Sequence, residues 1–125
     1  MELSPFFKSV LEQDRAPIVI CDCTHTIIYM NPAAAKAEEK HGGFSLVGKS
    51  IMDCHNERSR QAILRVFDWF GEEVSHNIVH TFHNPTVNKD VYMVALRDDS
   101  GELIGYYEKH EFRDRETMPR YALDR

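Results

Sequence analysis

The chain has 125 residues, 42% hydrophobic and 28% charged, which fits one domain with a real core rather than two domains. Its net charge of −5, with seven histidines counted as neutral, speaks against nonspecific binding to nucleic acid, because such binding needs a basic surface. No apolar run approaches the length of about 20 residues that a membrane span needs, and the first residues lack a basic-then-apolar leader, so we expect no membrane association and a cytoplasmic location.

Residues 1–16 predict a short N-terminal helix. Ser4 is a helix-capping residue, and Pro5 suits the first helical position because its missing N–H costs nothing there. The apolar residues at helical spacing are Phe7, Val10 and Leu11. A helix this short is marginal alone in water, so we expect it to cap the domain that follows by docking on its sheet or on a second chain.

Two β-branched runs follow, at 17–21 and 26–30, and the polar link at 22–25 suits a tight reversal between them. This pattern predicts a β-hairpin. Asn31 then stands where its side chain can cap a helix over 33–40, a segment rich in helix-forming residues.

The middle of the chain predicts a loop with one helical turn at 44–53, followed by the longest helix. Either Asp53 or Asn56 can cap this helix, and Gly71 is a natural stop for it. Its apolar stripe follows the helical period: Ile63, Val66, Phe67 and Phe70.

The last third changes to strand patterning. Strands are expected at 74–82, 91–96 and 103–112, with a glycine-containing hairpin turn at 98–101. Residues 17–112 therefore predict an α+β domain, a five-stranded antiparallel sheet with helices on one face. Residues 113–125 predict a polar C-terminal tail.

Three strings in this order resemble the PAS domain family. They are IIYMNPAA at 27–34, VGKSI at 47–51 and RDDSGELIG at 97–105, and together with the element order the resemblance covers about 6–112. The step Asp53-Cys54-His55 before the long helix is also similar to PAS modules found beside hemerythrin-like domains. The resemblance implies a PAS-like fold and a sensory or signalling role.

The resemblance also implies a ligand pocket between the concave face of the sheet and the helices, mostly apolar with few polar groups. Its expected lining from the helical side is Met52, His55, Ile63 and Phe67. Its expected lining from the strands is Tyr29, Ile78, His80, Tyr92, Val94 and Leu96. A small apolar or planar molecule would suit such a pocket. The alternative is a filled core, which makes the chain a ligand-free interaction domain.

The opposite face of the sheet then carries Val79, Val91 and Met93, although a solvated face should be polar. We therefore expect the N-terminal helix or a second copy of the chain to cover it, as in a symmetric homodimer. A small α+β enzyme is a third hypothesis, for which the strands offer His80 and Glu108. No catalytic motif pairs these two residues, so we expect no enzyme and no catalytic residues.

No cofactor follows from the sequence. His55 is the candidate ligand for haem, but haem-binding PAS domains carry this residue inside the long helix, where this chain has none. The cysteine string of the flavin photosensors is absent, which excludes flavin photochemistry. Cys21, Cys23 and His25 alternate as possible zinc ligands but lack a fourth, so we expect no metal. His76 and His80 should lie about 13 Å apart on a strand and His83 has the opposite parity, so these three histidines should not chelate one ion unaided.

Overall fold

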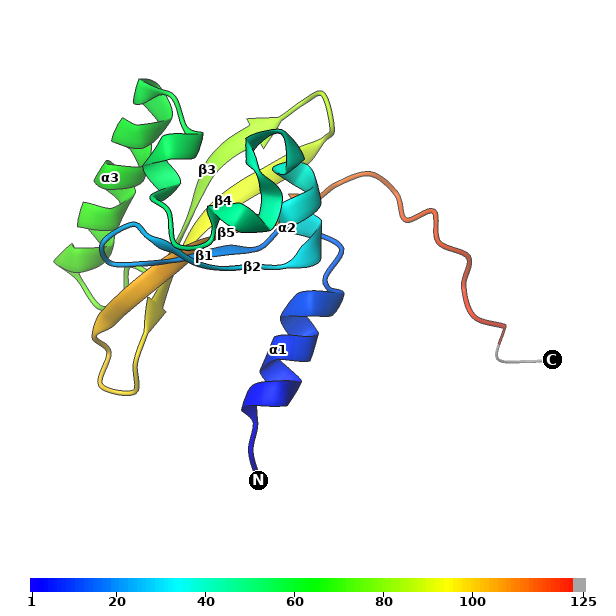
Figure 1. Ribbon diagram of the computed structural model, residues 1–125, viewed down its shortest axis with the longest axis horizontal. Coiled ribbons are helices and arrows are strands. Elements are labelled where there is room, and N and C mark those ends of the chain that lie inside the picture. Colours follow the sequence, from blue (N-terminus) through cyan, green and yellow to red (C-terminus); the bar gives the residue numbers. More distant parts are fainter. Residues whose placement is uncertain (123–125) are drawn as a thin grey trace.

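The structure, a computed structural model that describes residues 1–122, is built on a five-stranded antiparallel sheet with strand order β2-β1-β5-β4-β3 (Figure 1). Its strands are β1 (Val19–Asp22), β2 (Ile27–Met30), β3 (Ile78–Asn84), β4 (Lys89–Arg97) and β5 (Leu103–Phe112). Its α-helices are α1 (Ser4–Gln13), α2 (Pro32–Ala37) and α3 (Glu57–Glu72), and its 3-10 helices are η1 (Glu39–His41), η2 (Gly43–Leu46) and η3 (Ile51–Cys54). The predicted α+β class and five-stranded sheet are confirmed.

The N-terminal helix α1 extends away from the sheet (Figure 1), and none of its residues is buried. Its apolar side remains open, since Phe7 is 61% and Val10 is 70% exposed. The predicted cap at Ser4 is wrong, because the helix begins at Ser4 itself and the capping position, Leu3, makes no side-chain hydrogen bond. Within the described residues, α1 therefore does not cover the sheet.

Asn31 holds the entry to the domain together and is completely buried. Its side-chain oxygen accepts hydrogen bonds from the Ala34 and Ile18 backbone N–H groups, both at 2.9 Å, so the predicted cap of α2 is confirmed. Its amide nitrogen donates to the Leu11 carbonyl at 3.0 Å, which ties the end of α1 to the start of α2. One buried side chain thus joins three elements.

The long helix α3 begins where the sequence predicts, because the Asn56 side chain accepts a hydrogen bond from the Ser59 N–H at 2.9 Å. It does not stop at Gly71 but ends at Glu72. Arg97 of β4 satisfies its last turn, with Nη2 donating to the Phe70 carbonyl at 2.6 Å. A side chain distant in sequence therefore replaces the expected glycine stop.

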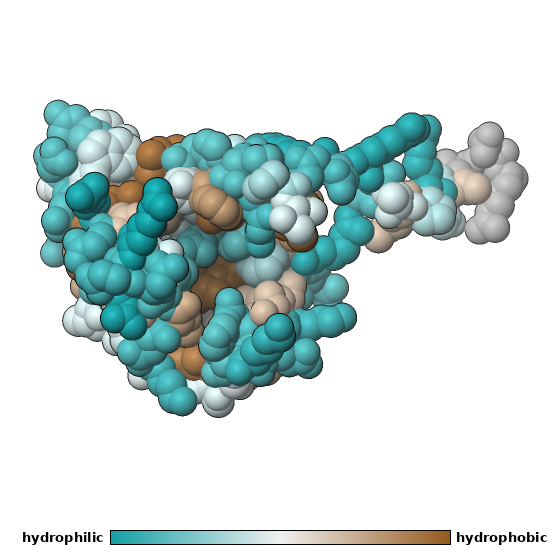
Figure 2. All heavy atoms as spheres, turned by 90° about the horizontal axis from the view of Figure 1, so that it is seen from above, coloured by the Kyte–Doolittle hydropathy of each residue, from teal (hydrophilic) through white to brown (hydrophobic). Residues whose placement is uncertain are grey.

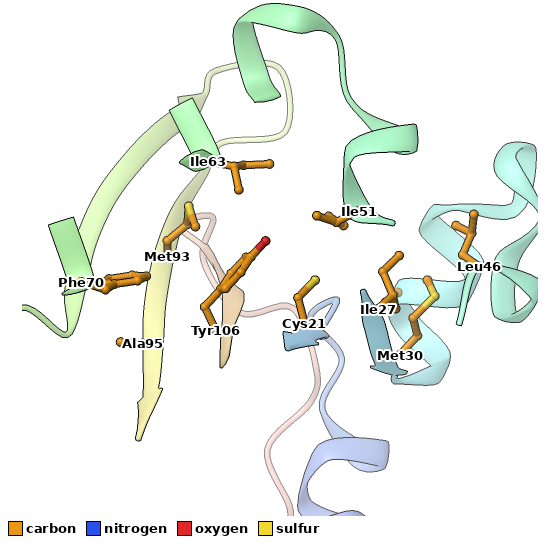
Figure 3. Close-up of a cluster of buried hydrophobic side chains, with 11 residues drawn as sticks. Cys21, Ile27, Met30, Leu46, Ile51, Ile63, Phe70, Met93, Ala95 and Tyr106 are labelled. Carbon is orange, nitrogen blue, oxygen red and sulfur yellow. The ribbon is translucent and has the colours of Figure 1, made fainter. Parts of the chain in front are cut away.

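The core lies between the sheet and the helices of one face, and Tyr106 of β5 stands near its middle (Figure 3). Ile63 and Phe70 approach it from α3, and Ile51 approaches from η3. Cys21 and Met93 complete the strand side. Within residues 1–122, the domain thus has two layers: one sheet and the helices over its inner face.

The register of the strands assigns every side chain of the sheet to a face. One row of paired residues on the inner face takes one residue from each strand: Met30, Val19, Glu108, Met93 and Val79. The neighbouring row on the outer face does the same: Tyr29, Ile20, Tyr107, Val94 and Ile78. On β4, Val91, Met93 and Ala95 are buried, whereas the residues between them are partly exposed.

The strand parity predicted from the sequence is therefore wrong. Val79, Val91 and Met93, which were expected outside, face the core. Both faces carry apolar residues, so the alternation could be fitted with either face inward, and an error of one residue exchanges the faces.

After β5 the chain leaves the domain as an extended segment (Figure 1). Its described part returns to the N-terminal region, where Arg15 and Glu116 form an exposed ion pair at 2.5 Å. The predicted polar tail covers 113–125, and its last three residues, 123–125, lie outside the described part.

Candidate ligand-binding cleft

A cleft of about 680 Å³ opens between the first half of α3 and the inner face of β3, β4 and β5. A smaller hollow of about 100 Å³ continues toward α2 and the 3-10 helices. The two spaces share four lining residues: His55, Lys89, Glu108 and His110. Seen from above, the molecule is hollowed, with hydrophobic atoms in the hollow and hydrophilic side chains around its rim (Figure 2).

The floor and walls of the larger space combine apolar and polar side chains. Val91 and Met93 of β4 form the floor, and Phe82 of β3 lines one side. Ala62 and Ile63 of α3 line the other side. A volume of a few hundred Å³ with apolar walls and a small polar group at one end is typical of a site for a small molecule.

Glu108 and His110 lie two residues apart on β5 and therefore face the cleft together. His110 Nε2 lies 3.7 Å from Glu108 Oε2. His110 Nδ1 is buried and has no hydrogen-bond partner among the described residues. Nearly all buried polar atoms in proteins have such a partner, so this nitrogen requires an explanation.

Glu108 lies on the covered face of the sheet, where burial and the neighbouring cationic groups act on its carboxyl in opposite directions. Burial raises the pKa of this carboxyl, but the neighbouring His110, His55 and Lys89 side chains favour its charged form more strongly, so its pKa lies below the ordinary value. The carboxylate lies between Val19 and Met93 in the inner row, where every other residue is apolar. Its charge is therefore maintained by the cationic groups of the cleft.

Two cations of the cleft make no close ion pair. Within residues 1–122, neither the Lys89 nor the Arg58 side chain lies within 4.0 Å of a carboxylate oxygen. Lys89 Nζ lies 5.7 Å from the centroid of the Phe112 ring. Arg58 is exposed on the first turn of α3 at the rim. Among the charged and imidazole groups that line the larger space, nitrogen-bearing ones therefore outnumber the single carboxylate, Glu108, whereas the smaller hollow adds Glu38.

The helical side of the predicted pocket is partly realised. His55 lines both spaces and Ile63 lines the larger one. Met52 and Phe67 pack against the core cluster instead, and the Phe67 ring lies edge-on to that of Tyr106 at 5.8 Å between centroids.

The strand side of the predicted pocket is corrected by the structure. Six expected residues point to the outer face or line neither space: Tyr29, Ile78, His80, Tyr92, Val94 and Leu96. The Tyr29 hydroxyl binds Glu12 of α1, and His80 Nε2 contacts Asp90 Oδ1 at 2.9 Å. The cause is the error of one residue in the predicted strand parity, which places the whole set of side chains on the opposite face of the sheet.

Reasoning from the sequence considered one of the residues that replace them, Glu108, only as a catalytic candidate, and missed the others. Lys89, Glu108 and His110 carry the polar end, and Val91 and Met93 carry the floor. Their signal is the two-residue spacing along β4 and β5, which places each set on one face once the register is known.

The three possible zinc ligands each have a different environment. Cys21 is buried in the core, the Cys23 thiol donates to the Leu103 carbonyl at 3.4 Å, and His25 Nδ1 contacts the Tyr106 hydroxyl at 2.8 Å. Over residues 1–122, no three His, Cys, Asp or Glu side chains are grouped as metal ligands.

The opposite parity expected for His80 and His83 is wrong. A bulge between His80 and Phe82 brings both onto the outer face, where each contacts Asp90 Oδ1 at 2.9 Å. The extra residue of the bulge is invisible in the alternation of the sequence.

None of the helices within residues 1–122 has both the length and the apolar character to cross a bilayer. No protein-family model matches the sequence, and no curated protein matches it closely.

Solved structures, in contrast, are similar to the chain. The PAS domain of a protein from Colwellia psychrerythraea matches 90% of this chain and 98% of its own, with a TM-score of 0.64 and 11% identity. The PAS domain of BvgS from Bordetella pertussis matches 89% of this chain and 86% of its own, with a TM-score of 0.56 and 16% identity. The Aer2 receptor from Vibrio cholerae, described as a dual PAS-heme oxygen sensor, matches 75% of this chain and 90% of its own, with a TM-score of 0.51 and 18% identity. The predicted PAS fold is confirmed.

Proposed function

We propose that this PAS-fold chain is a sensory module that binds a small molecule in the cleft under α3 and signals through contacts with a second copy of itself. The observation that carries the proposal is the cleft itself, with an apolar floor and a polar end that contains an unpartnered buried nitrogen, His110 Nδ1. A filled core would leave neither the space nor the unpartnered atom.

The second copy is supported by the outer face of the sheet. Its central row contains no charged residue, and Ile78 at the end of the row is 54% exposed. Tyr29 at the other end contacts α1, whose apolar side is also open. A twofold pair would cover both surfaces at once.

The alternatives are weaker. His80 and Glu108, the pair considered for catalysis, lie on opposite faces of the sheet and cannot act on one substrate. We therefore propose a module without catalysis.

Haem does not fit the residues present. His55 would be its ligand, but Glu108 and Lys89 share the same end of the cleft, and the apolar face of a porphyrin would bury both charges. We propose no step through such a group.

A native mass spectrum of the purified chain, repeated after denaturation, tests the proposal. We expect the folded mass to exceed a multiple of the chain mass by that of a small molecule, and the multiple to be two. A folded mass equal to the bare chain or its multiple would favour the ligand-free interaction domain.

Two variants link any retained mass to the cleft. Ala62→Trp places an indole in the space between α3 and the sheet and should abolish retention. Gln61→Trp, at the neighbouring exposed position outside the cleft, is the control and should retain the mass. Loss of the ligand from both variants, or from neither, would contradict binding in the cleft.

A further inference from the structure

The charges around the cleft are unevenly distributed although the whole chain is acidic. The larger space is lined by Arg58 and Lys89, by the imidazoles of His55 and His110, and by a single carboxylate, Glu108. The chain as a whole carries a net charge of −5. The cleft therefore has a local excess of positive and hydrogen-donating groups against the charge of the rest of the molecule.

The helix above the cleft adds to this excess. Residues of the first turn of α3, Arg58 and Ser59, line the larger space, so the N-terminal end of this 16-residue helix borders the cleft. The N-terminus of a helix carries a partial positive charge. The lining of the larger space thus combines a helix terminus, two cations and two imidazoles.

The inner row of the sheet contains a carboxylate that needs the positive groups of the cleft. Glu108 is the one charged residue of that row, with Val19 and Met93 as its neighbours. Placing a carboxylate between apolar side chains costs stability unless cations compensate it. His55, His110 and Lys89 supply that compensation and lower its pKa.

This arrangement favours one negative charge on the ligand. Lys89 has no carboxylate within 4.0 Å among residues 1–122, so its ammonium group is available to pair with a carboxylate of the ligand. A dianionic group such as a phosphate ester would be opposed by Glu108, and an amine would be opposed by Lys89 and Arg58. The floor of Val91 and Met93, with Phe82 at the side, suits an apolar body attached to the acid.

We infer that the cleft is selective for a small organic acid, whose carboxylate lies at the end formed by Lys89, His55 and His110 and whose apolar body lies on the β4 floor. The inference deepens the proposed sensory function and rests on it. It assigns the signal to a class of molecules: monocarboxylic acids with an aliphatic or aromatic chain.

Three probes with the same body and different head groups test the inference. They are 4-phenylbutyrate, 4-phenylbutyramide and 4-phenylbutylamine, titrated into the full chain while backbone amide resonances are followed by NMR. We expect 4-phenylbutyrate to shift the resonances of Val91, Met93 and Glu108 and to bind at least about tenfold more tightly than the other two.

Variants identify the groups that select the acid. Lys89→Gln should weaken binding of 4-phenylbutyrate about tenfold and leave the amide unaffected. Glu108→Gln should strengthen it, because the one carboxylate that lines the larger space is removed. Lys109→Gln is the matched control. Lys109 lies on β5 next to Glu108, but its side chain is on the outer face and forms an ion pair with Glu111.

The outcomes separate this inference from the function on which it rests. Equal affinity for the acid and the amide, or tighter binding of the amine, would overturn selectivity for an acid and leave a binding cleft in place. Weaker binding by Glu108→Gln would also overturn it. If no probe shifts the cleft resonances at millimolar concentration, the inference is wrong, and the mass spectrum decides separately whether another ligand is retained.

Discussion

Two adjacent rows of the sheet, one on each face, show how differently the chain uses similar residues. The outer row, Tyr29, Ile20, Tyr107, Val94 and Ile78, is uninterrupted by charge, yet α1 contacts it at the Tyr29 end and Ile78 at the other end is 54% exposed. The inner row is covered by the helices and contains Glu108 at its centre. Apolar character alone would assign the outer row to the core. The polar residue on the covered face therefore points to binding, and the apolar residues on the open face point to a partner.

The largest expected effect comes from truncating neighbouring residues of β4 that belong to opposite rows. Met93 is 2% exposed in the core, so Met93→Ala should lower the free energy of unfolding by about 2–5 kcal/mol. Val94→Ala should lower it by less than about 1 kcal/mol in the monomer, because the side chain is already partly in water. Urea denaturation at low protein concentration measures both. Equal losses would contradict the assignment of faces.

The same comparison explains what could be predicted from the sequence. The caps by Asn31 and Asn56 and the turn at Gly101, with φ of 87°, depend on hydrogen bonds and backbone angles within a few residues, so their signals are local. The overall sheet and the PAS fold followed from the order of such elements. These parts of the structure were predicted correctly or nearly so.

The cleft could be predicted only in part, because it depends on contacts between distant segments. His55 and Ile63 were found from the helix, but the strand residues depended on a parity that apolar alternation leaves open. The bulge near His80 changes that parity within one strand. The ending of α3 depends on Arg97, more than twenty residues later. The sequence pattern contains none of these contacts.

A smaller effect is expected from charges placed on the open surfaces. Phe7→Asp on α1 and Ile78→Asp on the outer face should raise the dissociation constant of the proposed dimer about a hundredfold. The wild-type side chains are 61% and 54% exposed in the single chain, so folding should not change. Analytical ultracentrifugation measures the association.

Phe44→Asp is the matched control, because Phe44 is 58% exposed on η2, on the opposite side of the sheet. We expect its dissociation constant to equal that of the wild type. If all three variants associate equally, the outer face is not the interface. If all three dissociate equally, the effect is one of general charge.

The smallest effect concerns the polar edge of the outer face. Hydrogen bonds from Arg113, and then from His83 and His80, lower the pKa of Asp90 to about 2 from an ordinary value of 3.8. A carboxyl with a lower pKa in the folded state stabilises the fold while it is ionised. This contribution is complete above about pH 4 and is lost as the pH falls toward about 2.

Asp90→Asn should therefore be less stable than the wild type near neutral pH, and the difference should shrink as the pH falls through this window. Thermal unfolding followed by circular dichroism between pH 2 and 7 measures it. Asp68→Asn, at an exposed position of α3 without an ion pair in the described part of the chain, is the control and should differ little from the wild type. A difference for Asp90→Asn that stays constant over the window would show that its amide loses packing rather than charge. Side-chain packing, and not the charge of Asp90, would then stabilise this edge of the outer face. The contacts of Arg113, His80 and His83 would serve to align β3 with β4 rather than to stabilise the carboxylate.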